Sequence, residues 1–73
     1  MKEYDVIRAL VDLTESVKKG TLGTILLVYP DFPTSYEVEF VDNNGETLEI
    51  LTVEANKIKK EWKIFQPYCQ FQV

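Results

Sequence analysis

The sequence predicts a small all-β domain, and three observations lead to this prediction. Residues 35–51 alternate polar and apolar side chains on both sides of a tight-turn motif, as a β-hairpin does. An apolar run ahead of this hairpin follows two glycines and ends at a proline, which is typical of a strand entered through a close turn. With 73 residues, 45% of them hydrophobic, the chain can build one core and one domain.

The first twenty residues allow two interpretations. At the helical angle of about 100° per residue, four apolar side chains fall on one side, and Gly20 would end the helix. These four are Val6, Leu10, Leu13 and Val17. Periodicity alone therefore favours a helix. The competing interpretation is a strand over residues 4–11 followed by a polar loop.

The next element is a strand predicted over residues 24–29. Gly20 and Gly23 lie just before it, where the backbone has to turn and approach a neighbour closely. Pro30 and Pro33 end the strand and open a loop that reaches Tyr36.

The central hairpin is predicted to turn at residues 43–45, with Gly45 in the left-handed position of a type I turn plus bulge. In this register Asp42 faces Glu46 and Val41 faces Thr47. The same register gives four side chains one buried face and the glutamates the other face. The four are Val38, Phe40, Leu48 and Ile50.

A two-residue loop would instead place Phe40 opposite Glu49, which buries a charge at high cost. The three-residue loop is therefore preferred, with Phe40 opposite Leu48 and Val38 opposite Ile50. The apolar phase then slips at residues 50–51, where we predict a bulge or bend of the kind that small barrels need at their corners.

Several motifs together resemble the small bacterial domain-of-unknown-function family 4926. They are an opening like YDVIRALVDL, the step KKGTLGT, the strand YEVEF running into a D..G hairpin, and a following strand that contains threonine, within residues 4–60. The resemblance favours the strand interpretation of the N-terminus. It implies a five-stranded SH3-like barrel over residues 1–60, with no established activity. Residues 61–73 depart from the family, and their own alternation predicts a C-terminal strand extension that packs on the same domain or on a second protomer. Family members often carry proline where this chain has Thr14-Glu15-Ser16, which leaves room for a helical turn there.

Acidic residues dominate the middle of the chain, since seven acids and no base lie between Asp31 and Asn56. Three of them, Glu37, Glu39 and Glu49, are predicted to share one sheet face. Like charges across a sheet repel each other, and a cationic partner would relieve this repulsion. The alternative is a charged face that only keeps the domain soluble.

We therefore predict a non-enzymatic protein-binding module, an inhibitor of the antitoxin or immunity type, that binds a basic partner through its acidic hairpin face. The glutamates would supply charge complementarity, and three aromatic side chains near the preceding loop would supply apolar anchors. These anchors are Tyr29, Phe32 and Tyr36.

Nothing in the sequence predicts catalysis, a metal site or a cofactor. The chain has no histidine, and it has neither a Walker nor a dinucleotide phosphate loop. Glu39 and Glu49 resemble an acid–base pair, but an open sheet face would leave both ionised. Residues 42–46 have the composition of a hairpin turn and lack the calcium-loop pattern.

A nucleic-acid-binding module similar to KOW domains is the alternative from another class. It would use Trp62 and the basic cluster Lys57, Lys59, Lys60 and Lys63. The net charge of −4 makes nucleic acid the less favoured partner. A third possibility is an accessory barrel of a larger enzyme complex.

The C-terminal residues predict self-association, because an uncharged strand with alternating apolar positions must pair with something. The expected contact of a homodimer involves Tyr68, Phe71 and Val73, while Cys69 is expected to be a small buried hydrophobe. No signal peptide and no membrane helix is visible in the sequence, so the cytoplasm is the expected location.

Overall fold

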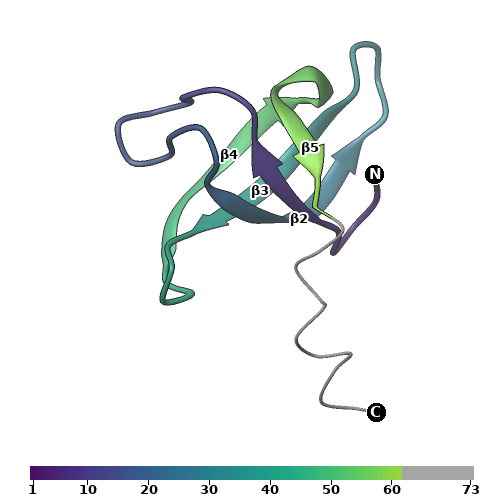
Figure 1. The fold of residues 1–73 in the computed structure, drawn as a ribbon. Coiled ribbons are helices and arrows are strands. Elements are labelled where there is room, and N and C mark those ends of the chain that lie inside the picture. Colours follow the sequence, from purple (N-terminus) through teal and green to yellow (C-terminus); the bar gives the residue numbers. More distant parts are fainter. Residues whose placement is uncertain (62–73) are drawn as a thin grey trace.

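Five antiparallel strands form a single sheet in the computed structural model, which describes residues 1–61 (Figure 1). The strands are β1 (Val6–Ala9), β2 (Leu22–Tyr29), β3 (Ser35–Val41), β4 (Thr47–Glu54) and β5 (Ile58–Lys60), with a 3-10 turn, η1 (Ala55–Lys57), before β5. Their order in the sheet is β4-β3-β2-β1-β5. The prediction of an all-β, five-stranded fold is confirmed.

The N-terminal segment forms a strand, and no helix lies within residues 4–18. β1 pairs with β2 on one side and with β5 on the other. Residues 10–21, between β1 and β2, form a loop that we call the long loop. It closes on itself, because the Leu13 and Thr14 N–H groups both donate to the Val17 carbonyl, at 2.8 and 3.2 Å. Val17 is fully buried, so its apolar side chain anchors the loop to the core.

β2 begins two residues before the predicted start, and Gly23 lies inside it. A Cβ at this position would lie 2.7 Å from Val38 Cγ1 and 3.0 Å from the Glu39 carbonyl oxygen. Gly23 therefore permits the close approach of β2 to β3. Leu26 is an extra residue in β2, because the pairing passes from Ile25 to Leu27 without it.

The hairpin between β3 and β4 turns at residues 43–45, as predicted. The Asp42 N–H donates to the Glu46 carbonyl at 2.9 Å, and the Gly45 N–H donates to the Asp42 carbonyl at 3.0 Å. Gly45 has a φ of +85°, in the left-handed region that favours glycine. Asp42 Oδ1 also accepts the N–H groups of Asn44 and Glu46, so the turn satisfies its own polar groups.

Beyond the first two pairs, Asp42 with Glu46 and Val41 with Thr47, the predicted register of this hairpin is wrong. Val41 does lie opposite Thr47, but Phe40 then lies opposite Glu49 and Val38 opposite Leu51. The extra residue on β4 is Leu48, so the bulge occurs earlier than residues 50–51.

This early bulge changes which side chains of β4 face the core. Leu48 and Leu51 pack against the core and Val53 is buried, whereas Ile50 is turned outward and is 52% exposed. The predicted burial of Ile50 is therefore wrong, since the bulge brings three apolar side chains inward in its place.

Every strand contributes to the core, which is completed by Val17 of the long loop. Its buried members are Ile7, Ala9, Val17, Ile25, Tyr36, Val38, Phe40, Val53 and Ile58. The two bulges flank β3 on both sides, and bulges bend and twist a sheet, which curls this one into a barrel-like shape. The predicted self-association residues Tyr68, Phe71 and Val73, together with Trp62, Lys63 and Cys69, lie outside the described residues.

Candidate functional site

The side of β2, β3 and β4 that points away from the core forms a continuous surface, which we call the outer face. Side chains of a strand alternate between the two faces of a sheet, so the neighbours of the buried Tyr36 and Val38 on β3 point outward. Strand pairing aligns them in three rows: Thr24–Glu39–Ile50, Leu27–Glu37–Thr52 and Tyr29–Ser35–Glu54.

Two carboxylates lie in the middle of this face, and both are held by hydroxyl groups of neighbouring strands. Glu37 Oε1 accepts the Thr52 hydroxyl at 2.6 Å and the Tyr29 hydroxyl at 3.5 Å. Glu39 Oε2 accepts the Thr47 hydroxyl. No lysine or arginine among residues 1–61 forms an ion pair with either carboxylate, so their negative charge is not neutralised by these residues.

Apolar side chains flank the two carboxylates directly. Leu27 lies opposite Glu37 and is 48% exposed, and Ile50 lies opposite Glu39 and is 52% exposed. Glu37 and Glu39 are two residues apart on one strand, so their Cα atoms are separated by about 7 Å. The outer face therefore combines two ordered negative charges with exposed hydrophobic surface on either side.

The sequence did not point to Leu27 or Ile50 as surface residues. Leu27 belongs to an uninterrupted apolar run without alternation, and the bulge at Leu26 turns it outward. The alternation of the hairpin predicts Ile50 in the core. Only the positions of the two bulges, which depend on pairing with β3, identify these side chains as part of the outer face.

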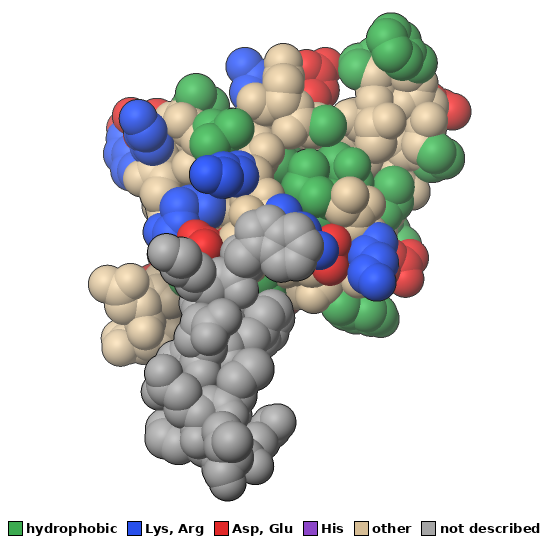
Figure 2. Space-filling view, turned by 45° about the vertical axis from the view of Figure 1, so that its right-hand side comes forward, with side chains coloured by type: hydrophobic (Ala, Val, Ile, Leu, Met, Phe, Trp, Pro, Cys, Tyr) green, Lys and Arg blue, Asp and Glu red, His purple; other side chains and the backbone are tan. Residues whose placement is uncertain are grey.

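The three predicted aromatic anchors have three different environments. Tyr29 lies on the outer face and is partly exposed, whereas Tyr36 is 6% exposed and belongs to the core. Phe32 is fully exposed in the loop between β2 and β3. Figure 2 shows hydrophobic side chains gathered at the tip of this loop, where Pro30 and Pro33 are exposed as well. Tyr29 and Phe32 are therefore available to a partner, and Tyr36 is not.

Glu49 does not share the outer face with Glu37 and Glu39. Its Oε2 accepts the Thr14 hydroxyl at 2.6 Å in a partly buried contact between β4 and the long loop. Thr14 Oγ1 in turn accepts the N–H groups of Ser16 and Val17, at 3.2 and 3.0 Å. Glu49 thus holds the loop in place, and the expected face of three glutamates contains two.

Figure 2 shows Lys and Arg side chains spread over one face of the molecule, with acidic side chains between them. Lys57 and Lys59 of the predicted basic cluster are exposed. Lys60 Nζ lies 3.7 Å from Asp5 Oδ2, and Arg8 Nε lies 2.7 Å from Glu61 Oε2. Glu61 and Asp5 thus neutralise part of the positive charge that β1 and β5 carry.

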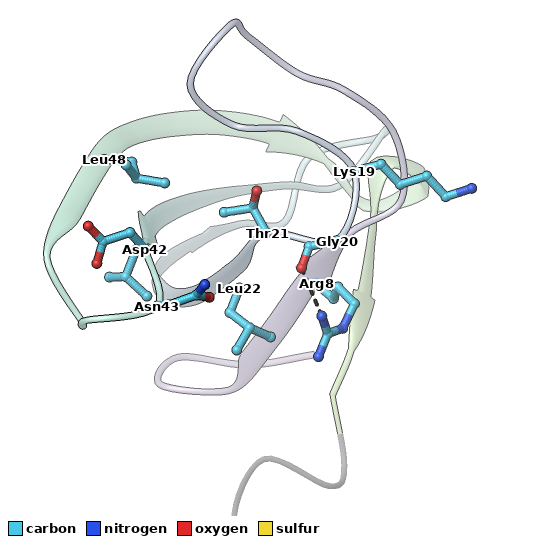
Figure 3. A pocket seen from close by; sticks show the side chains of 9 residues that line it. Arg8, Lys19, Gly20, Thr21, Leu22, Asp42, Asn43 and Leu48 are labelled. Atoms are coloured by element: carbon cyan, nitrogen blue, oxygen red, sulfur yellow. Dashed lines mark hydrogen bonds between the residues drawn. The ribbon is translucent and has the colours of Figure 1, made fainter.

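A hollow of about 460 Å³ lies between the hairpin turn and the end of the long loop (Figure 3). Arg8 and Asp42 stand on opposite sides of it. The Arg8 guanidinium also donates to the Gly20 carbonyl at 2.8 Å, and Asp42 Oδ1 accepts two N–H groups of the turn. Arg8 and Asp42 thus both have partners in the chain, and the polar side chains of Lys19, Thr21 and Asn43 also line the hollow.

No group of three or more acidic, histidine or cysteine side chains within residues 1–61 could hold a metal ion. The same part of the chain contains no helix that is long and apolar enough to span a membrane.

Comparison with known proteins agrees with the motifs in the sequence. Neither the curated proteins nor the solved structures include a significant match to the chain. One family profile, described as a domain of unknown function (DUF4926), matches residues 3–60, which contain all five strands. Because this match covers most of the sequence and the whole sheet, the chain belongs to the DUF4926 family.

Proposed function

We propose that this domain is a non-enzymatic protein-binding module whose outer face receives a basic partner. The observation that carries the proposal is the pair Glu37 and Glu39, held by hydroxyl groups, without a cationic partner among the described residues, and flanked by exposed Leu27 and Ile50. The apolar side chains offer contact area, and the oriented carboxylates offer charge complementarity to a basic surface.

The hydroxyl contacts favour a binding role over a purely solubilising one. A solubilising charge works best when it is fully hydrated and mobile, and it does not require ordered side chains. Here the Thr52 and Thr47 hydroxyls restrict the two carboxylates. This ordering lowers the entropy that binding would otherwise lose, and it leaves lone pairs free for a guanidinium or ammonium group.

The proposal is tested with the double variant Glu37→Gln/Glu39→Gln and a matched control, Glu15→Gln/Glu46→Gln. Both variants remove two negative charges from exposed or partly exposed positions, but only the first alters the outer face. The probe is a short peptide of alternating arginine and valine, and its affinity is measured by calorimetry at several salt concentrations.

The outer-face variant is expected to bind about twofold to thirtyfold more weakly, since each exposed ion pair contributes roughly 0.2–1 kcal/mol. Its affinity should also depend less on salt. The control variant should lose only the smaller, long-range part of the attraction. Equal losses in the two variants would show that net charge alone, and not the outer face, attracts the peptide.

In its more specific form, the proposal is that the partner is a small toxin that this domain inhibits, as antitoxin or immunity proteins do. Such a partner must present a basic, partly apolar surface to match the outer face. Inhibition of a candidate toxin by the unaltered domain, and its loss in the Glu37→Gln/Glu39→Gln variant, would support this form.

Nucleic acid remains the second candidate because Lys57 and Lys59 are exposed and lie two residues apart, in η1 and β5. Binding of this kind weakens steeply with salt, and it would depend on these lysines rather than on Glu37 and Glu39. Titration of a labelled single-stranded RNA with the Lys57→Gln/Lys59→Gln variant and the unaltered chain separates the two candidates.

A further inference from the structure

One edge of the sheet is open in the part of the chain that the structure describes. β4 stands at the end of the strand order and pairs with β3 alone. It contains eight residues, which makes it as long as β2 in the middle of the sheet. Its outer edge therefore presents a row of backbone groups without a neighbouring strand among residues 1–61.

The hydrogen-bond pattern identifies which backbone groups these are. The Ala55 N–H donates to the Thr34 carbonyl at 3.1 Å, and bonding in an antiparallel ladder alternates along the strand. The backbone N–H and C=O groups of Leu51 and Val53 therefore bond to β3. The alternate residues of β4 direct their N–H and C=O groups to the open edge. These are Ile50, Thr52 and Glu54, and their side chains are exposed.

The opposite edge differs in the features that protect edge strands. β5 has three residues, Ile58–Lys60, two of which are lysines. Short length and lysine are common ways to block the addition of another strand. β4 is long and contains no lysine, arginine or proline. Of the two edges, β4 is the one built to accept a strand.

Charge determines what kind of strand fits there. The sequence from β2 to the end of β4 contains seven acids and no base. Antiparallel addition of β4 from a second copy, centred on Ile50, would bring Glu46 next to Glu54 and would place two acidic layers side by side. A cationic strand meets the opposite situation. Its side chains on the outer face would lie next to Glu54, and in the same rows as Glu37 and Glu39, which are one strand further in.

We propose that β4 binds an extended segment of the basic partner by strand addition, with arginine or lysine alternating with apolar residues. This inference rests on the proposed function and adds its mode of binding. The backbone of the segment bonds to Ile50, Thr52 and Glu54, its apolar side chains continue the core side of the sheet, and its cationic side chains lie on the outer face.

Hydrogen exchange of the full-length chain, followed by NMR, tests the edge itself. In the free protein the amides of Ile50, Thr52 and Glu54 should exchange quickly, while those of Leu51 and Val53 are protected. The alternating arginine–valine peptide should then protect the first three amides. If these amides are already protected in the free chain, another segment or a second copy occupies the edge, and the proposal is overturned.

The peptide provides a second test that leaves the protein unaltered. In a second version of the peptide, the backbone nitrogens whose N–H groups would point toward β4 are methylated. This version keeps its charge but loses the backbone donors needed for strand addition. It should bind about tenfold or more weakly, because a tenfold change corresponds to one or two backbone hydrogen bonds. Equal binding of both peptides overturns strand addition.

A matched pair of variants separates this inference from the proposed function. Thr52→Pro and Thr52→Ala both remove the hydroxyl that Glu37 accepts, but only proline removes the outward N–H, and proline is tolerated at edge positions of this kind. Strand addition predicts weaker peptide binding for Thr52→Pro than for Thr52→Ala. If binding depends on Glu37 and Glu39 but not on this N–H or on N-methylation, the proposed function stands and strand addition fails.

Discussion

Gly23 offers the sharpest test of the packing between β2 and β3. Replacement by alanine adds a Cβ that would lie 2.7 Å from Val38 Cγ1, 3.0 Å from Phe40 Cδ1 and 3.0 Å from the Glu39 carbonyl oxygen. Val38 and Phe40 are fully buried, so neither side chain can move into solvent. The third contact is with the backbone carbonyl of Glu39, and this group can move only if β3 shifts away from β2.

The expected loss follows from two opposing contributions. Alanine favours the folded state by about 0.5–1 kcal/mol relative to glycine within a strand, because the unfolded chain loses flexibility. Overpacking of a filled core costs about 1–3 kcal/mol, and a contact of 2.7 Å lies at the upper end of this range. We therefore expect Gly23→Ala to lower the free energy of unfolding by about 1–2 kcal/mol, and the melting temperature by roughly 4–16 °C.

The assay is thermal and urea unfolding followed by circular dichroism, in a double-mutant cycle with Val38→Ala. Removal of the Val38 methyl groups takes away the nearest atom, so Gly23→Ala should be less harmful by about 0.5 kcal/mol or more in that background. The contact with the Glu39 carbonyl remains and should keep the effect from vanishing. A neutral or stabilising Gly23→Ala, or an equal effect in both backgrounds, would refute the reasoning.

Three further predictions concern the hairpin and the long loop. Gly45→Val should lower the free energy of unfolding by about 1–2 kcal/mol in urea titrations, because a β-branched residue resists a φ of +85°, and a loss below a few tenths would contradict this. Thr14→Val should lower the free energy of unfolding by about 1–2 kcal/mol, because it removes the hydroxyl that donates to Glu49. Thr14→Ser keeps this hydroxyl and should be about as stable as the unaltered chain. Equal melting temperatures of the two variants would contradict the role of the hydroxyl. Ile50→Ser should lower the free energy of unfolding by less than about 1 kcal/mol, because Ile50 is half exposed. Leu51→Ala should lower it by about 2 kcal/mol, because Leu51 packs against the core. The reverse order would contradict the observed register.

The features that could be predicted from the sequence are those governed by local physics. The turn at residues 43–45 requires a left-handed residue three positions after Asp42, and Gly45 is the residue that adopts this conformation at least cost. The outward position of Glu37 and Glu39 follows from alternation along β3, because the extra residues of both bulges belong to β2 and β4 and not to β3. The resemblance to the family added the choice between strand and helix at the N-terminus, where periodicity alone favoured the wrong element.

The tertiary structure decided where the two β-bulges lie, at Leu26 and Leu48. The positions of these bulges determine which side chains form the candidate site. The sequence argues against pairing Phe40 with Glu49, because this register buries a charge at high cost. The long loop supplies a partner for this charge through the Thr14 hydroxyl, thirty-five residues away in the chain. With Glu49 satisfied, the bulge at Leu48 can bring Leu51 and Val53 inward and turn Ile50 outward. A contact between segments so distant in sequence leaves no periodic trace, so only the folded chain shows that the outer face consists of two carboxylates and their apolar neighbours.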